Sequence, residues 1–169
     1  MRSFYLFFLI VCFSCSTIDI KDQTKIGIRQ YENDSLKEAI VTFSGIIEKT
    51  DTCKNCYLYR GFAYKALKEY DKALLDLDAF INIDTTDALG YSNRASVYYL
   101  KNDYKSALQD FLYAYQLDSA SVLLNPISHM LFVNGYKDSA CFFYEKSMLF
   151  GDTVFNEEIK LYCEKKNYR

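Results

Sequence analysis

The sequence predicts an all-α protein built from stacked helix pairs, and three observations support this prediction. The stretch 57–119 repeats itself at a spacing of 34 residues, because Tyr57 and Arg60 are matched by Tyr91 and Arg94. A period of this length indicates supersecondary units that stack on one another. The chain of 169 residues contains one Pro and six Gly, which suits helices. Its apolar residues recur at spacings of three and four, as they do on one face of a helix.

The N-terminal stretch is predicted to be a signal peptide outside the fold. Arg2 supplies a short positive region, and the apolar run over 4–13 is too short to cross a bilayer core of about 30 Å as a helix. Ser14 then precedes Cys15, and this arrangement resembles the bacterial lipobox, whose Cys becomes a lipidated N-terminus. We therefore expect a signal peptide over 1–14 and a lipidated Cys15 with a short linker to residue 19. An ordinary cleaved signal or a short uncleaved anchor is the alternative.

The first repeat is expected over 20–53, where Gly27 lies 34 residues before Gly61. Its second helix carries apolar residues at helical spacing. Ser35 and Glu38 form the sequence pattern of a capping box, so we expect this helix to begin after Ser35.

The second and third repeats, over 54–87 and 88–120, each place a small residue where two helices cross. In the second repeat Gly61 is expected to face Ala73. Two helices approach to about 8 Å only where the contacting side chains are small, so these positions predict a close crossing. The polar residues 85–87 are expected to cap the helix that follows.

The fourth repeat is expected over 121–154, and a final helix over 155–169. Asn125 followed by Pro126 predicts a helix start with Pro at its first position. Gly135 predicts the end of that helix in the left-handed conformation. The last stretch has one apolar face and a charged remainder, which suits the polar outer cap that a solenoid needs.

Residues 20–154 resemble four tetratricopeptide repeats (TPRs) followed by a capping helix. The resemblance implies a right-handed superhelix that binds peptides or proteins in a concave groove lined by the first helix of each pair. It places ligand-contacting residues at Leu58, Phe62, Lys65, Ser92, Ser96, Tyr99, His129 and Phe132. Further groove positions are Ile28, Tyr31, Asn55, Leu89, Val122 and Asn125.

The expected groove is apolar and aromatic, which suits an extended or helical apolar peptide. Its only basic residue is Lys65, so we do not expect a clamp for a peptide's C-terminal carboxylate. The sequence thus predicts a protein- or peptide-binding scaffold or adaptor, lipid-anchored at a membrane surface of the bacterial cell envelope, on the periplasmic or outer-membrane face. A self-associating structural subunit is one alternative.

Two Arg–Asp pairs stand 16 residues apart, Arg60 with Asp76 and Arg94 with Asp110. Both members are replaced in the first and fourth repeats. This joint presence or absence predicts an ion pair between the two helices of a repeat. The alternative interpretation is that the Arg residues bind an anionic ligand.

Four cysteines follow the signal peptide, and four cysteines allow three disulfide connectivities. Cys53 and Cys56 form the obvious local pair, and Cys141 with Cys163 is a second candidate. A disulfide is permitted if the protein is exported. The other alternative function is a thiol-active envelope protein that uses Cys53 and Cys56. These two residues have the thioredoxin-like spacing but lack a βαβ setting.

The remaining composition argues against catalysis and against nucleic acid. His129 is the only histidine, so neither a catalytic triad nor a four-ligand zinc site is expected. The net charge is −2 and no basic block occurs, so nucleic acid is not an expected partner. We therefore expect no enzymatic activity, no cofactor, no metal and no small-molecule substrate.

Overall fold

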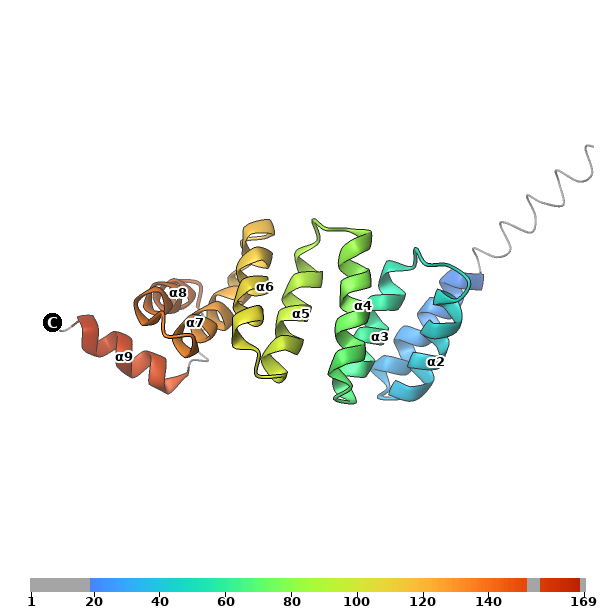
Figure 1. Ribbon diagram of the computed structural model, residues 1–169, viewed down its shortest axis with the longest axis horizontal. Coiled ribbons are helices and arrows are strands. Elements are labelled where there is room, and N and C mark those ends of the chain that lie inside the picture. Colours follow the sequence, from blue (N-terminus) through green and yellow to red (C-terminus); the bar gives the residue numbers. More distant parts are fainter. Residues whose placement is uncertain (1–18, 152–155, 168–169) are drawn as a thin grey trace, which may run out of the picture. The chain divides into compact units, whose positions relative to one another are not determined.

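The structure, a computed structural model, describes residues 19–151 and 156–167. Every regular element among these residues is a helix, which confirms the predicted all-α class (Figure 1). A helix described over 19–32 is followed by α2 (Leu36–Ile47), α3 (Lys54–Ala66), α4 (Tyr70–Ile83), α5 (Ala88–Leu100), α6 (Tyr104–Leu117), the short 3₁₀ helix η1 (Ser121–Leu123), α7 (Leu124–Val133), α8 (Lys137–Leu149) and α9 (Glu157–Asn167). The predicted signal peptide and Cys15 lie outside the described residues.

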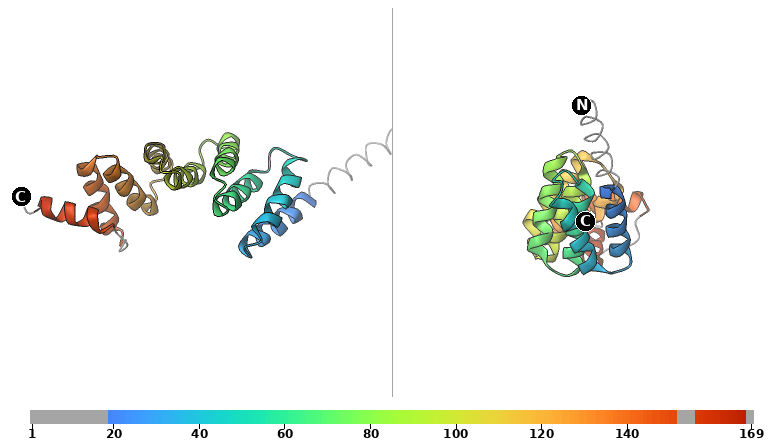
Figure 2. Two further views of the ribbon diagram at one scale, coloured as in Figure 1. Left: turned by 60° about the horizontal axis from the view of Figure 1, so that its bottom comes forward. Right: turned by 90° about the vertical axis from the view of Figure 1, so that its right-hand side faces the viewer.

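The chain divides into two compact units, Met1–Ile83 and Asp84–Arg169, here called unit 1 and unit 2. In unit 1, α3 packs against both α2 and α4. In unit 2, α5 packs on α6, α6 on α7, α7 on α8, and α8 on α9. Figure 2 shows the helices of each pair lying side by side. Neighbours in sequence are therefore neighbours in space, as in a repeat protein.

The predicted close crossings are present within the helix pairs. A Cβ added to Gly61 would lie 3.5 Å from the Ala73 carbonyl oxygen, so the helices meet where the sequence predicts. At Gly27 the crossing is tighter, because an added Cβ would lie 2.7 Å from the ring of Phe43. In α7 the matching residue is Ser128, whose hydroxyl donates to the carbonyl oxygen of Ala140 at 2.9 Å.

The turns inside the helix pairs share one backbone conformation. Asp34, Lys68 and Asn102 have positive φ angles of 60°, 62° and 61°, and Gly135 has a φ of 88°. The residue after each turn donates its N–H five positions back, as Glu69 does to the Tyr64 carbonyl oxygen at 2.9 Å. This bond satisfies a carbonyl at the end of the helix. The prediction for Gly135 is confirmed, and the left-handed turn extends to the three other pairs.

Two predicted helix starts are wrong in detail. Ser35 is the N-cap residue of α2, but its side chain makes no capping hydrogen bond. Helix α7 begins at Leu124, after η1, so Asn125 is not its N-cap and Pro126 lies in the third helical position. Pro is accepted there because the first four N–H groups of a helix have no intrahelical partner. Asp87 caps α5 as predicted, accepting from the Leu89 N–H at 2.9 Å.

Candidate functional site

The residues predicted to contact a ligand fall in both units. Helix α3 of unit 1 carries Leu58, Phe62 and Lys65. In unit 2, α5 carries Ser92, Ser96 and Tyr99, and α7 carries His129 and Phe132. The two groups are described separately below.

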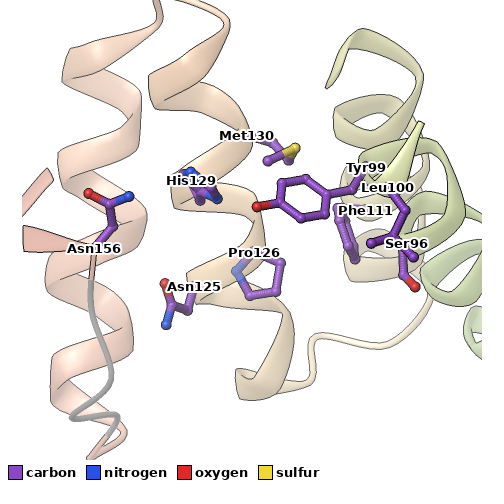
Figure 3. Close-up of a pocket in the computed structure, with 9 residues that line it drawn as sticks. All are labelled: Ser96, Tyr99, Leu100, Phe111, Asn125, Pro126, His129, Met130 and Asn156. Atoms are coloured by element: carbon purple, nitrogen blue, oxygen red, sulfur yellow. The ribbon is translucent and has the colours of Figure 1, made fainter. Parts of the chain in front are cut away.

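Unit 2 contains a pocket of about 510 Å³ between α5 and α7, here called the α5–α7 pocket (Figure 3). Three of the predicted residues, Ser96, Tyr99 and His129, line it together. The full lining is Ser96, Tyr99, Leu100, Phe111, Asn125, Pro126, His129, Met130 and Asn156. Positions three and four apart share a helix face, which is why each helix contributes residues at this spacing.

Tyr99 and His129 face each other across the pocket. Their rings meet edge to face with centroids 5.8 Å apart, and Figure 3 shows the Tyr99 hydroxyl pointing toward His129. Burial lowers the pKa of His129, and the nearby charge of Glu158 opposes this shift. A lowered pKa keeps the imidazole neutral at pH 7, where one ring nitrogen donates a hydrogen bond and the other accepts one.

The lining of the α5–α7 pocket is mainly apolar and contains no charged side chain. Amide groups come from Asn125 and from Asn156, whose side-chain oxygen also accepts from the Glu158 N–H at 2.9 Å and so caps α9. An apolar pocket with a few polar groups binds apolar side chains and orients what is attached to them.

Two predicted contact residues are buried, and the prediction for them needs correction. Leu58 is 6% exposed and Phe132 is 8% exposed. The ring of Phe132 packs edge to face on Tyr162 of α9, with centroids 5.8 Å apart, and Lys137 lies over both rings. Neither side chain is offered to a ligand. Ser92 remains on α5, where its hydroxyl donates to the Leu89 carbonyl oxygen.

Unit 1 presents an aromatic cluster, defined by Tyr31, Tyr59 and Phe62. The three ring centroids lie 5.8 to 6.1 Å from one another, and each residue is partly exposed. Lys65 lies over the ring of Phe62 at 5.2 Å, and burial lowers the pKa of its ammonium group. The sequence indicated Tyr31, Phe62 and Lys65 but not Tyr59.

The Arg–Asp pairs are ion pairs between helices, as predicted. Arg60 donates to both carboxylate oxygens of Asp76 at 2.8 and 2.6 Å, and Arg94 does the same to Asp110 at 2.7 and 2.9 Å. The bond to Asp76 raises the pKa of Arg60, whereas burial raises the pKa of Asp76 and Arg60 opposes that shift. These directions disagree on whether the pair favours its charged form. The two short parallel bonds decide for a carboxylate–guanidinium pair.

Both candidate disulfides are formed. Cys53 is bonded to Cys56 with an S–S distance of 2.01 Å, and Cys141 to Cys163 with one of 2.05 Å. The second bond joins α8 to α9. In the part of the chain that the structure covers, no group of three or more His, Cys, Asp and Glu side chains is arranged to hold a metal ion. No helix within the same residues is long and apolar enough to cross a membrane.

Comparison with known proteins bears on the fold. No protein-family model matches the chain, and no curated sequence matches it. Solved structures do match. MamA from Desulfovibrio magneticus RS-1 is 17% identical with a TM-score of 0.71, over 76% of this chain and 73% of that one. The Yersinia enterocolitica type III secretion chaperone SycD, in complex with a peptide of the translocator YopD, is 17% identical with a TM-score of 0.65, over 71% and 95%.

A third match is the first TPR of Spaghetti (RPAP3) bound to the HSP90 peptide SRMEEVD. It is 16% identical with a TM-score of 0.64, over 68% of this chain and 91% of that chain. At these identities the likeness establishes the fold. The chain has the helical-repeat fold of TPR proteins.

Proposed function

We propose that this chain is a protein- or peptide-binding scaffold and that the α5–α7 pocket receives a large apolar side chain of its partner. The pocket carries the proposal, because Tyr99, Leu100, Pro126 and Met130 line a volume of about 510 Å³. That volume is in the usual range for ligand pockets. The matched structures of SycD and RPAP3 hold peptides on the same fold.

The polar groups of the pocket orient the rest of an extended peptide. Ser96, Asn125 and Asn156 lie on its lining, and side-chain hydroxyl and amide groups there bind peptide N–H and C=O groups. The neutral imidazole of His129 contributes one donor and one acceptor. Since no cation lines the pocket, it prefers an apolar peptide to an acidic one such as the HSP90 peptide that RPAP3 binds.

The aromatic cluster of unit 1 supplies a second contact surface in this proposal. Partly exposed aromatic rings are typical binding hot spots. Lys65, over Phe62, makes this surface the more polar of the two. Phe62→Asp is therefore expected to weaken partner binding separately from any change in unit 2.

We also propose that Cys15 is lipidated and holds the protein on a membrane surface of a bacterial envelope. The support is the sequence: a short positive region, an apolar run, and Ser14 before Cys15. Intact mass of the protein from its membrane fraction tests this. A mass equal to a chain starting at Cys15 plus acyl groups is expected, and loss of membrane association in Cys15→Ser. A mass equal to the unprocessed chain would rule the anchor out.

Selection from a random linear-peptide library on the purified chain tests the binding function. We expect enrichment of peptides with aromatic or large aliphatic residues. Tyr99→Asp places a charge in the pocket and should weaken a selected peptide by tenfold or more, about 1.4 kcal/mol or above, measured by fluorescence anisotropy.

The matched control is Leu149→Asp, because Leu149 is 87% exposed and lies outside the pocket lining. It should leave the affinity unchanged, and circular dichroism should show both variants folded. Enrichment of acidic C-terminal sequences, or equal affinity of Tyr99→Asp and the parent chain, would contradict the proposal.

A further inference from the structure

The Cys53–Cys56 disulfide lies at the start of α3. Cys53 is the N-cap residue of that helix and Cys56 is in its first turn. The sequence has the spacing of a thiol-active pair without a βαβ unit. A helix N-terminus is itself one of the settings that stabilise a thiolate, whichever fold provides the helix. Helix α3 provides that setting here.

The two sulfur atoms differ in access. Cys53 lines a pocket of about 810 Å³ in unit 1, whereas Cys56 has no exposed surface and packs with Ala39, Phe43 and Ile46. An incoming thiol can therefore approach the sulfur of Cys53 only. Thiol–disulfide exchange requires attack on a particular sulfur atom, so this asymmetry fixes the direction of the reaction.

The pocket over Cys53 brings basic and hydroxyl groups near the disulfide. The Thr24 hydroxyl lies 3.9 Å from the sulfur of Cys53 and 3.7 Å from that of Cys56. Lys21, Lys25, Lys49 and Lys54 line the same pocket. On the first helix, Asp22 pairs with Lys25 at 2.9 Å and Asp19 lies 3.9 Å from Lys49.

We propose that Cys53–Cys56 is an exchange-active disulfide that oxidises a dithiol-containing protein. A thiolate of the partner attacks Sγ of Cys53, a bond forms between these two sulfurs, and the Cys53–Cys56 bond breaks. Its electron pair goes to Sγ of Cys56, which takes up a proton. This site is separate from the α5–α7 pocket, and the proposal does not depend on the peptide-binding function.

The second step releases the partner. Its other thiolate attacks the partner sulfur bonded to Cys53, closing the partner's own disulfide. Cys53 leaves as a thiolate at the N-terminus of α3, where the helix stabilises it. The partner has lost two electrons and two protons, and the chain has gained two electrons. The chain's own disulfide is the oxidant, so the reaction needs no other.

The Cys141–Cys163 disulfide is an internal control. Both of its cysteines are buried, with exposures of 5% and 2%, and neither stands at the start of a helix. It has the same bond chemistry without access or a helix N-terminus. It should remain intact while Cys53–Cys56 reacts.

The experiment incubates the folded oxidised chain with a reduced Cys-x-x-Cys peptide, quenches by alkylation, and maps the thiols by mass spectrometry. Cys53–Cys56 should open at least ten times faster than Cys141–Cys163, with an equal amount of oxidised peptide formed. With reduced glutathione, Cys56→Ser should carry a mixed disulfide on Cys53, whereas Cys53→Ser should carry none on Cys56.

Equal rates for the two disulfides would overturn the proposal, as would reaction only in urea or a mixed disulfide on Cys56 in the parent chain. The rate comparison uses the unmutated chain, so it holds even if a cysteine variant does not fold. Peptide affinity measured with Cys53–Cys56 reduced should be unchanged, which keeps this result distinct from failure of the binding function.

Discussion

In the α3–α4 pair a bidentate ion pair joins the two helices, through Arg60 and Asp76, whereas the α7–α8 pair has Ile127 and Phe143 at the same two positions. The side chains of Asp76 and Arg60 are only 5% and 17% exposed, and Ile127 is fully buried. One helix pair therefore fills this space with a desolvated charge pair, and the other with apolar side chains.

The comparison shows which features every helix pair needs. The small residue at the crossing and the left-handed turn occur in both pairs, whereas the ion pair occurs in one. The attraction within a buried ion pair is largely offset by the loss of hydration of its two charges. The crossing thus depends on shape. The ion pair can be exchanged for apolar contacts, but only if both charges are removed together.

The largest expected effect comes from removing one charge of the ion pair. Asp76→Ala leaves Arg60 partly buried without its carboxylate, so the free energy of unfolding should fall by about 3 kcal/mol. Arg60→Met with Asp76→Leu imitates the α7–α8 pair and should recover most of this loss. Urea denaturation followed by circular dichroism measures both.

The exposed pair of Lys25 and Asp22 serves as the control, with side chains 72% and 61% exposed. Exposed ion pairs contribute little, so Asp22→Ala should leave the urea midpoint nearly unchanged. If Asp76→Ala were no more destabilising than Asp22→Ala, the buried ion pair would have no role in holding α3 on α4.

A smaller effect is expected where an added methyl group tests the crossings themselves. Gly27→Ala places a Cβ 2.7 Å from the buried ring of Phe43, so it should cost about 1–3 kcal/mol of stability. Gly61→Ala meets its nearest neighbour at 3.4 Å, which is ordinary contact, and should be neutral or stabilising by up to about 1 kcal/mol. Equal urea midpoints for the two variants would mean that the first crossing relaxes freely.

The smallest expected effect concerns the turns of the same two pairs. Lys68 adopts the left-handed conformation that Gly135 adopts in the α7–α8 pair. Lys68→Gly relieves this strain and should raise the free energy of unfolding by up to about 1 kcal/mol. Gly135→Ala should lower it by a similar amount, since no neighbour lies within 4 Å of the added Cβ and only the backbone is strained. Thermal unfolding midpoints that move in the same direction for both variants would contradict this account.

The 34-residue period predicted most of the fold because it reports contacts within one helix pair. Gly61 and Ala73 meet, and α4 and α6 begin at Tyr70 and Tyr104, as the sequence predicts. Local capping was less predictable. Ser35 has the residue type for a cap, but its backbone geometry does not direct the hydroxyl to the helix. The 3₁₀ helix before α7 moved that start ahead of Asn125.

The site was partly predictable for a related reason. Tyr99 and His129 occupy groove positions on successive first helices, so the TPR resemblance brought them together. Phe132 occupies such a position too, but Tyr162, thirty residues later, covers it. Asn156 joins the pocket from the segment before α9, outside any repeat. Tyr59 had no periodic signal, because the residue 34 positions later is Asn93.

The bond between Cys141 and Cys163 changes the connectivity of the C-terminal region. The two residues are 22 positions apart and enclose the junction between α8 and α9 in a covalent ring. Helix α9 is therefore joined to the rest of the molecule by two routes, the main chain and the sulfur bridge. A single break in the peptide backbone inside the ring would not detach this helix, and its removal requires two separate bond cleavages.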